Sequence, residues 1–117
     1  MKVNEIQNIL NADVLCCEEH LDIEVHSACG SDMMSDVLAF VKDQSVLLTG
    51  LCNPQVIRTA EMLDMKCVVF IRNKRPDKLI IDMAKAKGIV VLCSPLRMYS
   101  ACGLLYSHGL GAGECSV

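Results

Sequence analysis

Hydrophobic positions occur along the chain in short continuous runs, and each run is followed by a segment with helical spacing. Runs without polar interruptions are typical of strands covered on both faces of a sheet. The three clearest are Val46–Leu48, Cys67–Ile71 and Ile89–Leu92. Their alternation with helical segments predicts an α/β fold, with a mostly parallel sheet of four to five strands and helices on both faces.

The segment from Ser45 to Arg75 forms the central strand–helix–strand unit of this prediction. Its first strand should end at Thr49 and Gly50. Asn53 is a suitable N-cap, and Pro54 suits the first helical position because a helix start leaves that N–H unpaired anyway. The helix should bury one face, consisting of Val56, Ile57, Ala60 and Leu63.

The preceding residues extend this unit toward the amino terminus. A short helix is expected over residues 2–11 and a brief strand over Asp13–Cys17. Leu21–Cys29 alternates apolar and polar residues, which indicates a strand with one solvated face. A helix with Ser31 as its N-cap should follow. Its expected apolar stripe consists of Met33, Met34, Val37, Leu38 and Val41.

Two more helices are expected toward the carboxyl terminus. Asp77 should open a helix that ends at Gly88, and Ser94 with Pro95 should open a last helix that reaches about Ser107. Three glycines from residue 109 onward indicate a flexible tail. The sequence thus predicts one domain over residues 1–108 and a tail over 109–117.

Composition narrows the class of protein. Hydrophobic residues make up 52% of the chain, but the longest apolar runs hold about five residues, far fewer than the ~20 that span a bilayer. The amino terminus lacks the separate basic and apolar regions of a secretory signal, so we expect a cytoplasmic protein without contact to a membrane. The eight cysteines are therefore expected to be reduced and to behave as small hydrophobic residues.

Charge is distributed unevenly along the chain. Residues 1–50 hold nine acidic and two basic side chains, whereas residues 51–117 hold five acidic and nine basic ones. This asymmetry suits attraction between two halves of one domain or between two copies in a homodimer. With a net charge of −3 and 3% aromatic residues, the chain offers neither a basic face nor a stacking platform for nucleic acid.

Candidate binding residues lie where the predicted parallel strands end. Ligands of open parallel sheets usually bind at the carboxyl ends of strands, where helix amino termini with unpaired N–H groups suit an anion. Three loops should meet there: Thr49–Asn53, Arg72–Arg75, and Cys93–Ser94. The residues expected to bind an anionic, nucleotide-like ligand are Thr49, Gly50, Asn53, Arg72, Lys74 and Ser94.

Sequence signatures of catalysis are missing, which predicts a protein that is not an enzyme. The chain has no phosphate-binding loop that ends in Gly-Lys-Ser/Thr, no dinucleotide fingerprint and no Gly-x-Ser-x-Gly. Cys52 is the best candidate for a reactive thiol, because a helix start would lower its pKa. A metal site is a further alternative, from Cys16, Cys17, His20, His26 and Cys29, although no Cys-x-x-Cys pair occurs.

Three stretches resemble the stand-alone DRTGG-domain proteins of anaerobic bacteria. They are residues 31–40, residues 48–61 (LTGLCNPQVIRTAE) and residues 101–106 (ACGLLY). These proteins are similar to the amino-terminal domain of HPr kinase/phosphorylase, and related domains accompany CBS domains in some pyrophosphatases. Of the name-giving string, Thr49-Gly50 stands at a strand end. The resemblance implies an α/β fold, frequent dimerisation and a regulatory role, for some members near iron-only hydrogenase components.

The sequence therefore predicts a non-catalytic regulatory module, homodimeric, that binds an anionic metabolite and acts on a partner enzyme related to a hydrogenase or a kinase. One alternative is a structural adaptor whose apolar last helix, Leu96–Leu105, packs against a partner or a second copy. The other is a redox or metal protein that uses the cysteines.

Overall fold

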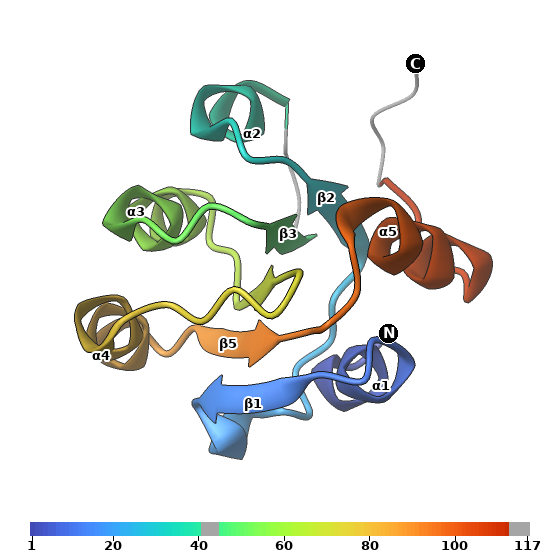
Figure 1. The fold of residues 1–117 in the computed structure, drawn as a ribbon, viewed down its shortest axis with the longest axis horizontal. Helices are drawn as coiled ribbons and strands as arrows, with labels where there is room; N and C mark the ends of the chain where they lie inside the picture. Colours follow the sequence, from blue (N-terminus) through green and yellow to red (C-terminus); the bar gives the residue numbers. More distant parts are fainter. Residues whose placement is uncertain (41–44, 113–117) are drawn as a thin grey trace.

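A computed structural model describes residues 1–40 and 45–112 as one five-stranded sheet with helices on both faces (Figure 1). The strands are β1 (Asp13–Cys16), β2 (Ser27–Gly30), β3 (Ser45–Thr49), β4 (Cys67–Phe70) and β5 (Val90–Cys93). The α-helices are α1 (Val3–Ile9), α2 (Met34–Phe40), α3 (Pro54–Met62), α4 (Lys78–Lys87) and α5 (Met98–Ser107), and Glu18–His20 forms a 3-10 turn. The predicted α/β class is confirmed.

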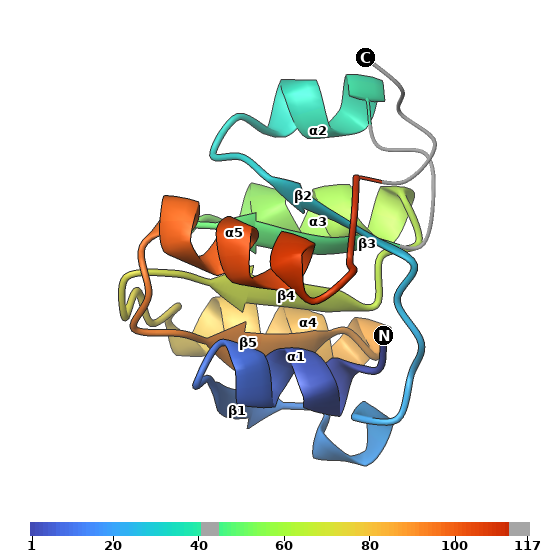
Figure 2. The same ribbon diagram turned by 90° about the vertical axis from the view of Figure 1, so that its right-hand side faces the viewer.

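The order of the strands across the sheet is β1-β5-β4-β3-β2. Strands β2 to β5 run parallel to one another, and only the edge strand β1 is antiparallel to its neighbour β5. Helices α1 and α5 pack on one face of the sheet, while α2, α3 and α4 pack in a row on the other (Figure 2). The carboxyl ends of the four parallel strands consequently meet at one edge.

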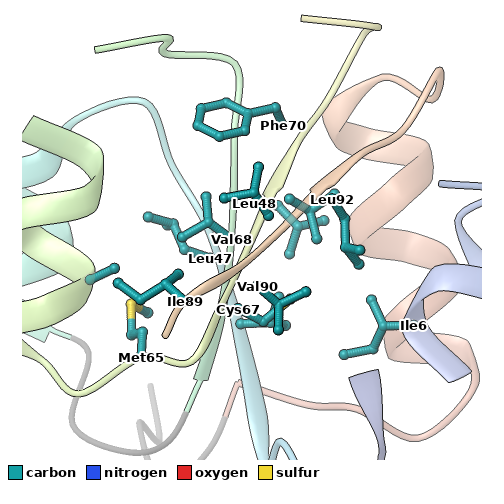
Figure 3. Packing of buried hydrophobic residues seen from close by; sticks show 14 of the residues in the cluster. Ile6, Leu47, Leu48, Met65, Cys67, Val68, Phe70, Ile89, Val90 and Leu92 are labelled. Carbon is teal, nitrogen blue, oxygen red and sulfur yellow. The ribbon is translucent and has the colours of Figure 1, made fainter. Parts of the chain in front are cut away.

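The core lies on both faces of the central strands (Figure 3). Every residue of β3, β4 and β5 is buried, which explains why these strands lack the alternation of a half-solvated strand. Helices contribute one face each, for example Val56, Ile57 and Ala60 from α3. Burial of this apolar surface at roughly 25 cal/mol per Å² is the main stabilising contribution to the fold.

Three helix ends are formed as predicted. The Asn53 side chain accepts a hydrogen bond from Gln55 N at the start of α3, with Pro54 as the first helical residue. Asp77 caps α4 by accepting from Ile80 N. Gly88 ends α4 in the left-handed region at a φ of 67°, which favours glycine because a Cβ is strained there.

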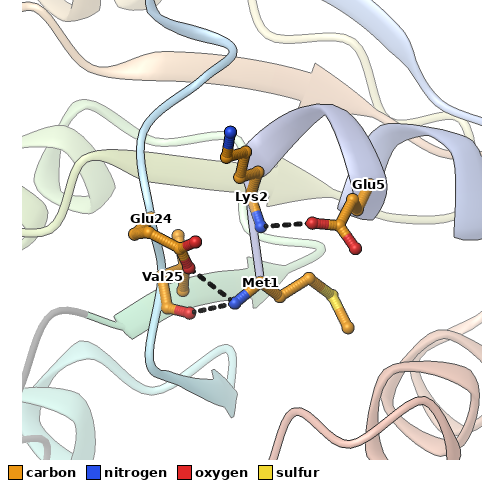
Figure 4. Close-up of polar contacts among 5 residues, drawn as sticks. All are labelled: Met1, Lys2, Glu5, Glu24 and Val25. Atoms are coloured by element: carbon orange, nitrogen blue, oxygen red, sulfur yellow. Dashed lines mark hydrogen bonds and ion pairs between the residues drawn. The ribbon is translucent and has the colours of Figure 1, made fainter.

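The strand predicted over Leu21–Cys29 is wrong for most of its length, since only Ser27–Gly30 forms β2. Residues 21–25 instead bond to the amino terminus: Val3 N donates to Ile23 O, and the Met1 amino group contacts Glu24 Oε2 at 2.8 Å and Val25 O at 3.0 Å (Figure 4). The backbone of this segment therefore pairs with the first residues of the chain and not with a neighbouring strand of the sheet.

The helix predicted after Ser31 begins three residues later, at Met34. Ser31 Oγ accepts from Met33 N and so forms a turn before the helix. Met34 and Val37 are buried as expected, but Met33 is 59% exposed and Leu38 41% exposed. The buried stripe is therefore narrower than predicted. Val41, its last expected member, lies outside the described residues.

The last helix also begins later than predicted, at Met98 rather than at Ser94 and Pro95. Ser94 follows β5 directly, and its hydroxyl donates to Leu10 O at 2.7 Å. Beyond α5, Leu110 is buried, and Gly111 O accepts from Ala28 N of β2 at 2.9 Å. The described part of the expected tail, residues 109–112, thus contacts the edge of the sheet.

Candidate functional site

The rim of the sheet, defined here as residues 31–32, 49–53, 71–75 and 94–97, follows the carboxyl ends of β2 to β5. The parallel registers place Gly30, Leu48, Val69 and Leu92 in one row across these strands. The prediction that the exits of the three central strands share one edge is confirmed. Such an edge is where ligands of open parallel sheets bind.

Asp32 organises the first half of the rim. Its Oδ1 accepts a hydrogen bond from Thr49 Oγ1 at 3.0 Å and a second from Gly50 N at 2.7 Å. Thr49 Oγ1 in turn accepts from Leu51 N at 3.1 Å. These contacts hold the turn after β3, but they also occupy N–H groups that the sequence had suggested for an anion.

The basic loop, residues 72–75, forms the second half of the rim. Arg72 and Asn73 both adopt the left-handed conformation, with φ values of 56° and 55°. Their backbone N–H groups donate to Leu96 O at 2.8 Å and Ser94 O at 2.9 Å. The basic loop is thereby bonded to the connection between β5 and α5, and its unusual backbone is held by the neighbouring segment.

Arg72 also reaches across to the turn after β3. A Cβ built on Gly50 would clash with Arg72 Nη2, so the guanidinium rests where any other residue would place its side chain. Glycine at position 50 thus lets the Arg72 side chain lie against the backbone of this turn. This contact joins the two halves of the rim through a side chain that is otherwise exposed.

Positive charge at the rim is largely uncompensated. Arg75 pairs with Asp13 of β1, but within residues 1–40 and 45–112 neither Arg72 nor Lys74 forms an ion pair or a side-chain hydrogen bond. Both side chains are exposed. Two cations without acidic partners at the end of a parallel sheet can bind phosphate groups by direct charge-assisted hydrogen bonds.

The six predicted site residues have different roles in the structure. Thr49, Gly50 and Arg72 come together at the rim, and Lys74 lies in the same loop. Asn53 Oδ1 is occupied by the cap of α3. Ser94 is fully buried, so its hydroxyl bonds within the chain instead of facing the rim.

Two rim residues were not predicted. Asp32 directly follows the predicted N-cap Ser31, and its contact with Gly50 depends on the pairing of β2 with β3, which the sequence did not show. Arg97 is exposed immediately before α5, beside Leu96 whose carbonyl accepts from Arg72 N. A correct start for the last helix would have identified Arg97 as a rim cation.

Burial counteracts the activation predicted for the Cys52 thiol. Burial raises the pKa of Cys52, the opposite of the predicted lowering, because the partial burial outweighs the attraction of Lys74. Burial likewise raises the pKa of Cys16 to about 11. Within the described part of the chain, no three His, Cys, Asp or Glu side chains are placed to hold a metal ion together.

The geometry defines a class: a three-layer α/β domain with a basic rim at the carboxyl ends of a parallel sheet. The model of the DRTGG domain family matches residues 5–107. The chain belongs to this family. No curated protein matches the sequence.

A solved structure has the same fold. It contains the CBS and DRTGG domains of the regulatory region of Clostridium perfringens pyrophosphatase, complexed with the activator diadenosine tetraphosphate. The TM-score is 0.73 at 16% sequence identity, and the match covers 99% of this chain and 53% of that one. This chain thus spans about half the length of that regulatory region. None of the helices among the described residues has the length and apolar character needed to cross a membrane.

Proposed function

We propose that the protein is a non-catalytic regulatory module that binds an anionic, nucleotide-like metabolite at the rim. The observation that carries this proposal is the position of Arg72, whose exposed guanidinium lies against Gly50 without an acidic partner among the described residues. Lys74 adds a second unpaired cation in the same loop. Two comparisons support the proposal. The chain belongs to the DRTGG domain family, and a solved structure with the same fold is a regulatory region complexed with a nucleotide activator.

The charge pattern of the rim favours a nucleotide over a bare anion. Arg72 and Lys74 suit phosphate groups, whereas Asp32 would repel them. Only Oδ1 of Asp32 is bonded in the described structure, so Oδ2 is left to accept from hydroxyl or amino groups. Ribose hydroxyls and base amino groups are such donors, and a nucleotide carries both of them together with phosphate.

Binding is tested by thermal shift and calorimetry with inorganic phosphate, mononucleotides and dinucleoside polyphosphates. We expect a nucleotide to raise the melting temperature, and Arg72→Ala with Lys74→Ala to abolish this rise. The matched control is Arg58→Ala with Lys85→Ala, which removes two exposed cations of α3 and α4 that form no ion pair in the described structure. This control should retain the full rise.

Two outcomes would overturn the anion site. One is the lack of any shift with every anion in the series, and the other is an equal loss of shift in the control variant. Stabilisation by phosphate alone, with no further gain from nucleotides, would retain the cationic site but reject the nucleotide.

The regulatory role further requires a recipient of the signal. We propose that the module acts as a homodimer on a partner enzyme, related to a hydrogenase or a kinase as the family resemblance implies. The second candidate function, a structural adaptor, is favoured by one observation: α5 exposes Tyr99 and Tyr106 on an uncharged face. Pull-down with the double variant Arg72→Ala and Lys74→Ala separates the two, since only an adaptor would bind its partner independently of nucleotide.

A further inference from the structure

The outer face of α5 is exposed, aromatic and without charge. Tyr99 is 91% exposed and Tyr106 72% exposed, and no Asp, Glu, Lys or Arg occurs between Met98 and Ser107. The tyrosines form one face of the helix with Ser100, Gly103 and Ser107, and these five residues line an open depression of about 730 Å³ together with Cys102 and Leu104. Exposed tyrosines in the absence of charge are typical of the central part of protein–protein interfaces.

The residues of this face are arranged symmetrically about Gly103. They recur at the i, i+1, i+4, i+7, i+8 spacing of one helical face. At 3.6 residues per turn, Tyr99 and Tyr106 lie on one flank of Gly103, and Ser100 and Ser107 lie on the other. The face therefore presents an aromatic flank, a serine flank and a central position without a side chain.

Gly103 is not required by the packing of the chain itself. A Cβ at this position would meet no atom of residues 1–40 and 45–112 within 4 Å, and glycine inside a helix is less stable than alanine. A glycine does, however, let a second helix approach closely, because the distance between packed helices depends on the side chains at their contact. The absence of a side chain at the centre of the face is thus better explained by contact with a second helix than by packing within the chain.

We propose that a second copy of this chain docks on α5, with the two helices antiparallel and crossing at Gly103 on a two-fold axis. A two-fold axis perpendicular to the plane of both helices brings matching flanks together. Tyr99 then lies against the partner subunit's Tyr106, and Ser100 lies against the partner subunit's Ser107. Two aromatic pairs are formed at one interface, which is isologous and closes at two copies.

Charge complementarity supports the antiparallel direction. Arg97 stands at the amino-terminal end of α5, where a cation is unfavourable, and it has no ion pair within the described residues. The last turn of α5 contains no basic residue. In the antiparallel pair, each Arg97 approaches the negative carboxyl-terminal end of the partner helix, whereas a parallel pair would bring like helix ends together.

The first test is the oligomeric state, measured by sedimentation and light scattering at about 100 μM. The wild-type chain should be a dimer, and Gly103→Glu should be a folded monomer because two carboxylates would meet on the two-fold axis. Circular dichroism verifies the fold of this variant. The control is Met62→Glu, which changes a 72% exposed residue of α3 on the opposite face of the sheet and should leave the dimer intact.

The second test uses the wild-type chain, whose only two tyrosines are Tyr99 and Tyr106. Photo-oxidative dityrosine cross-linking should give a covalent dimer linked between position 99 of one copy and position 106 of the other. Tyr99→Phe and Tyr106→Phe keep the apolar contact, but each should abolish the covalent dimer. Links of 99 to 99 or 106 to 106 would contradict the antiparallel register.

The inference rests on the proposed homodimer but not on the anion site, and the two fail separately. A wild-type monomer, or a dimer that persists in Gly103→Glu, overturns the α5 interface while nucleotide stabilisation is measured independently. A protein that dimerises through α5 but shows no thermal shift with any anion would overturn the anion site alone.

Discussion

Thr49 and Gly50 lie at the end of strand β3 and also bond to Asp32, and the sequence predicts only the first of these two features. Thr49 and Gly50 were predicted at a strand end from the apolar run that precedes them, and the structure places them there. Their partner Asp32 lies 17 and 18 residues away. Contacts of this kind depend on which strands are neighbours, and local spacing contains no information about strand order.

Gly50→Ala separates the binding role of this residue from its structural role. The new Cβ would clash with Arg72 Nη2, and the flexible arginine side chain would swing away. We expect the free energy of unfolding to change by less than ~1 kcal/mol, while the nucleotide-induced thermal shift decreases.

Gly111→Ala is the matched control, since a Cβ there meets no atom of the described residues within 4 Å, and it should leave the shift unchanged. A Gly50→Ala variant that binds nucleotide as well as the wild type would show that Arg72 does not contact the ligand.

At the scale of elements, the predicted N-caps Asn53 and Asp77 are formed, whereas the helix starts predicted at Ser31 and Ser94 are not. Asn53 and Asp77 accept from the first turns of α3 and α4 as their sequence pattern indicates. Ser94 had an equally suitable pattern, with Pro95 after it, but its hydroxyl instead bonds to Leu10 O across the molecule. A tertiary contact thus replaced a local cap, and the last helix starts at Met98.

The packing of α5 on β2 depends on a glycine that a matched substitution can test. A Cβ on Gly30 would lie 2.7 Å from Cys102 Sγ and 2.9 Å from Met98 Sδ. Gly30→Ala should therefore push α5 away and lower the free energy of unfolding by about 1–3 kcal/mol, as measured by urea denaturation.

Gly103→Ala on the same helix should instead raise the free energy of unfolding. Because no atom in the described part of the chain lies within 4 Å of the added Cβ, helix propensity should stabilise the isolated chain by up to about 1 kcal/mol. The comparison is made at concentrations where both variants are monomeric. Equal effects of the two substitutions would contradict the close packing of α5 on β2.

At the scale of the whole molecule, the single core explains why the fold class was predictable. Three continuous apolar runs identified β3, β4 and β5, because strands covered on both faces need no polar positions. The length of the edge strand β2 was harder to predict, because residues 21–25, which alternate like a strand, bond to the amino terminus and not to a strand of the sheet.

The burial of the individual thiols predicts the order in which they react. Cys52 is exposed, whereas Cys16 and Cys67 are buried. Burial raises the pKa of all three, and only the thiolate reacts. Alkylation near neutral pH should therefore be slow and should modify Cys52 before the other two.

Peptide mass spectrometry measures this order at several pH values. The rate at Cys52 should increase about tenfold per pH unit below its pKa, and Cys16 and Cys67 should react only after unfolding. Rapid alkylation of Cys52 at pH 6 would contradict the raised pKa and restore the case for a reactive thiol.

The two hydrogen bonds from Arg72 and Asn73 to Leu96 and Ser94 have a consequence for local opening of the domain. Because both amides donate to the segment that leads into α5, neither stretch can become exposed to solvent while the other keeps its hydrogen bonds. Their amide protons should exchange with deuterium as one cooperative group. A metabolite that immobilises the basic loop would then also slow exchange at the entrance to α5.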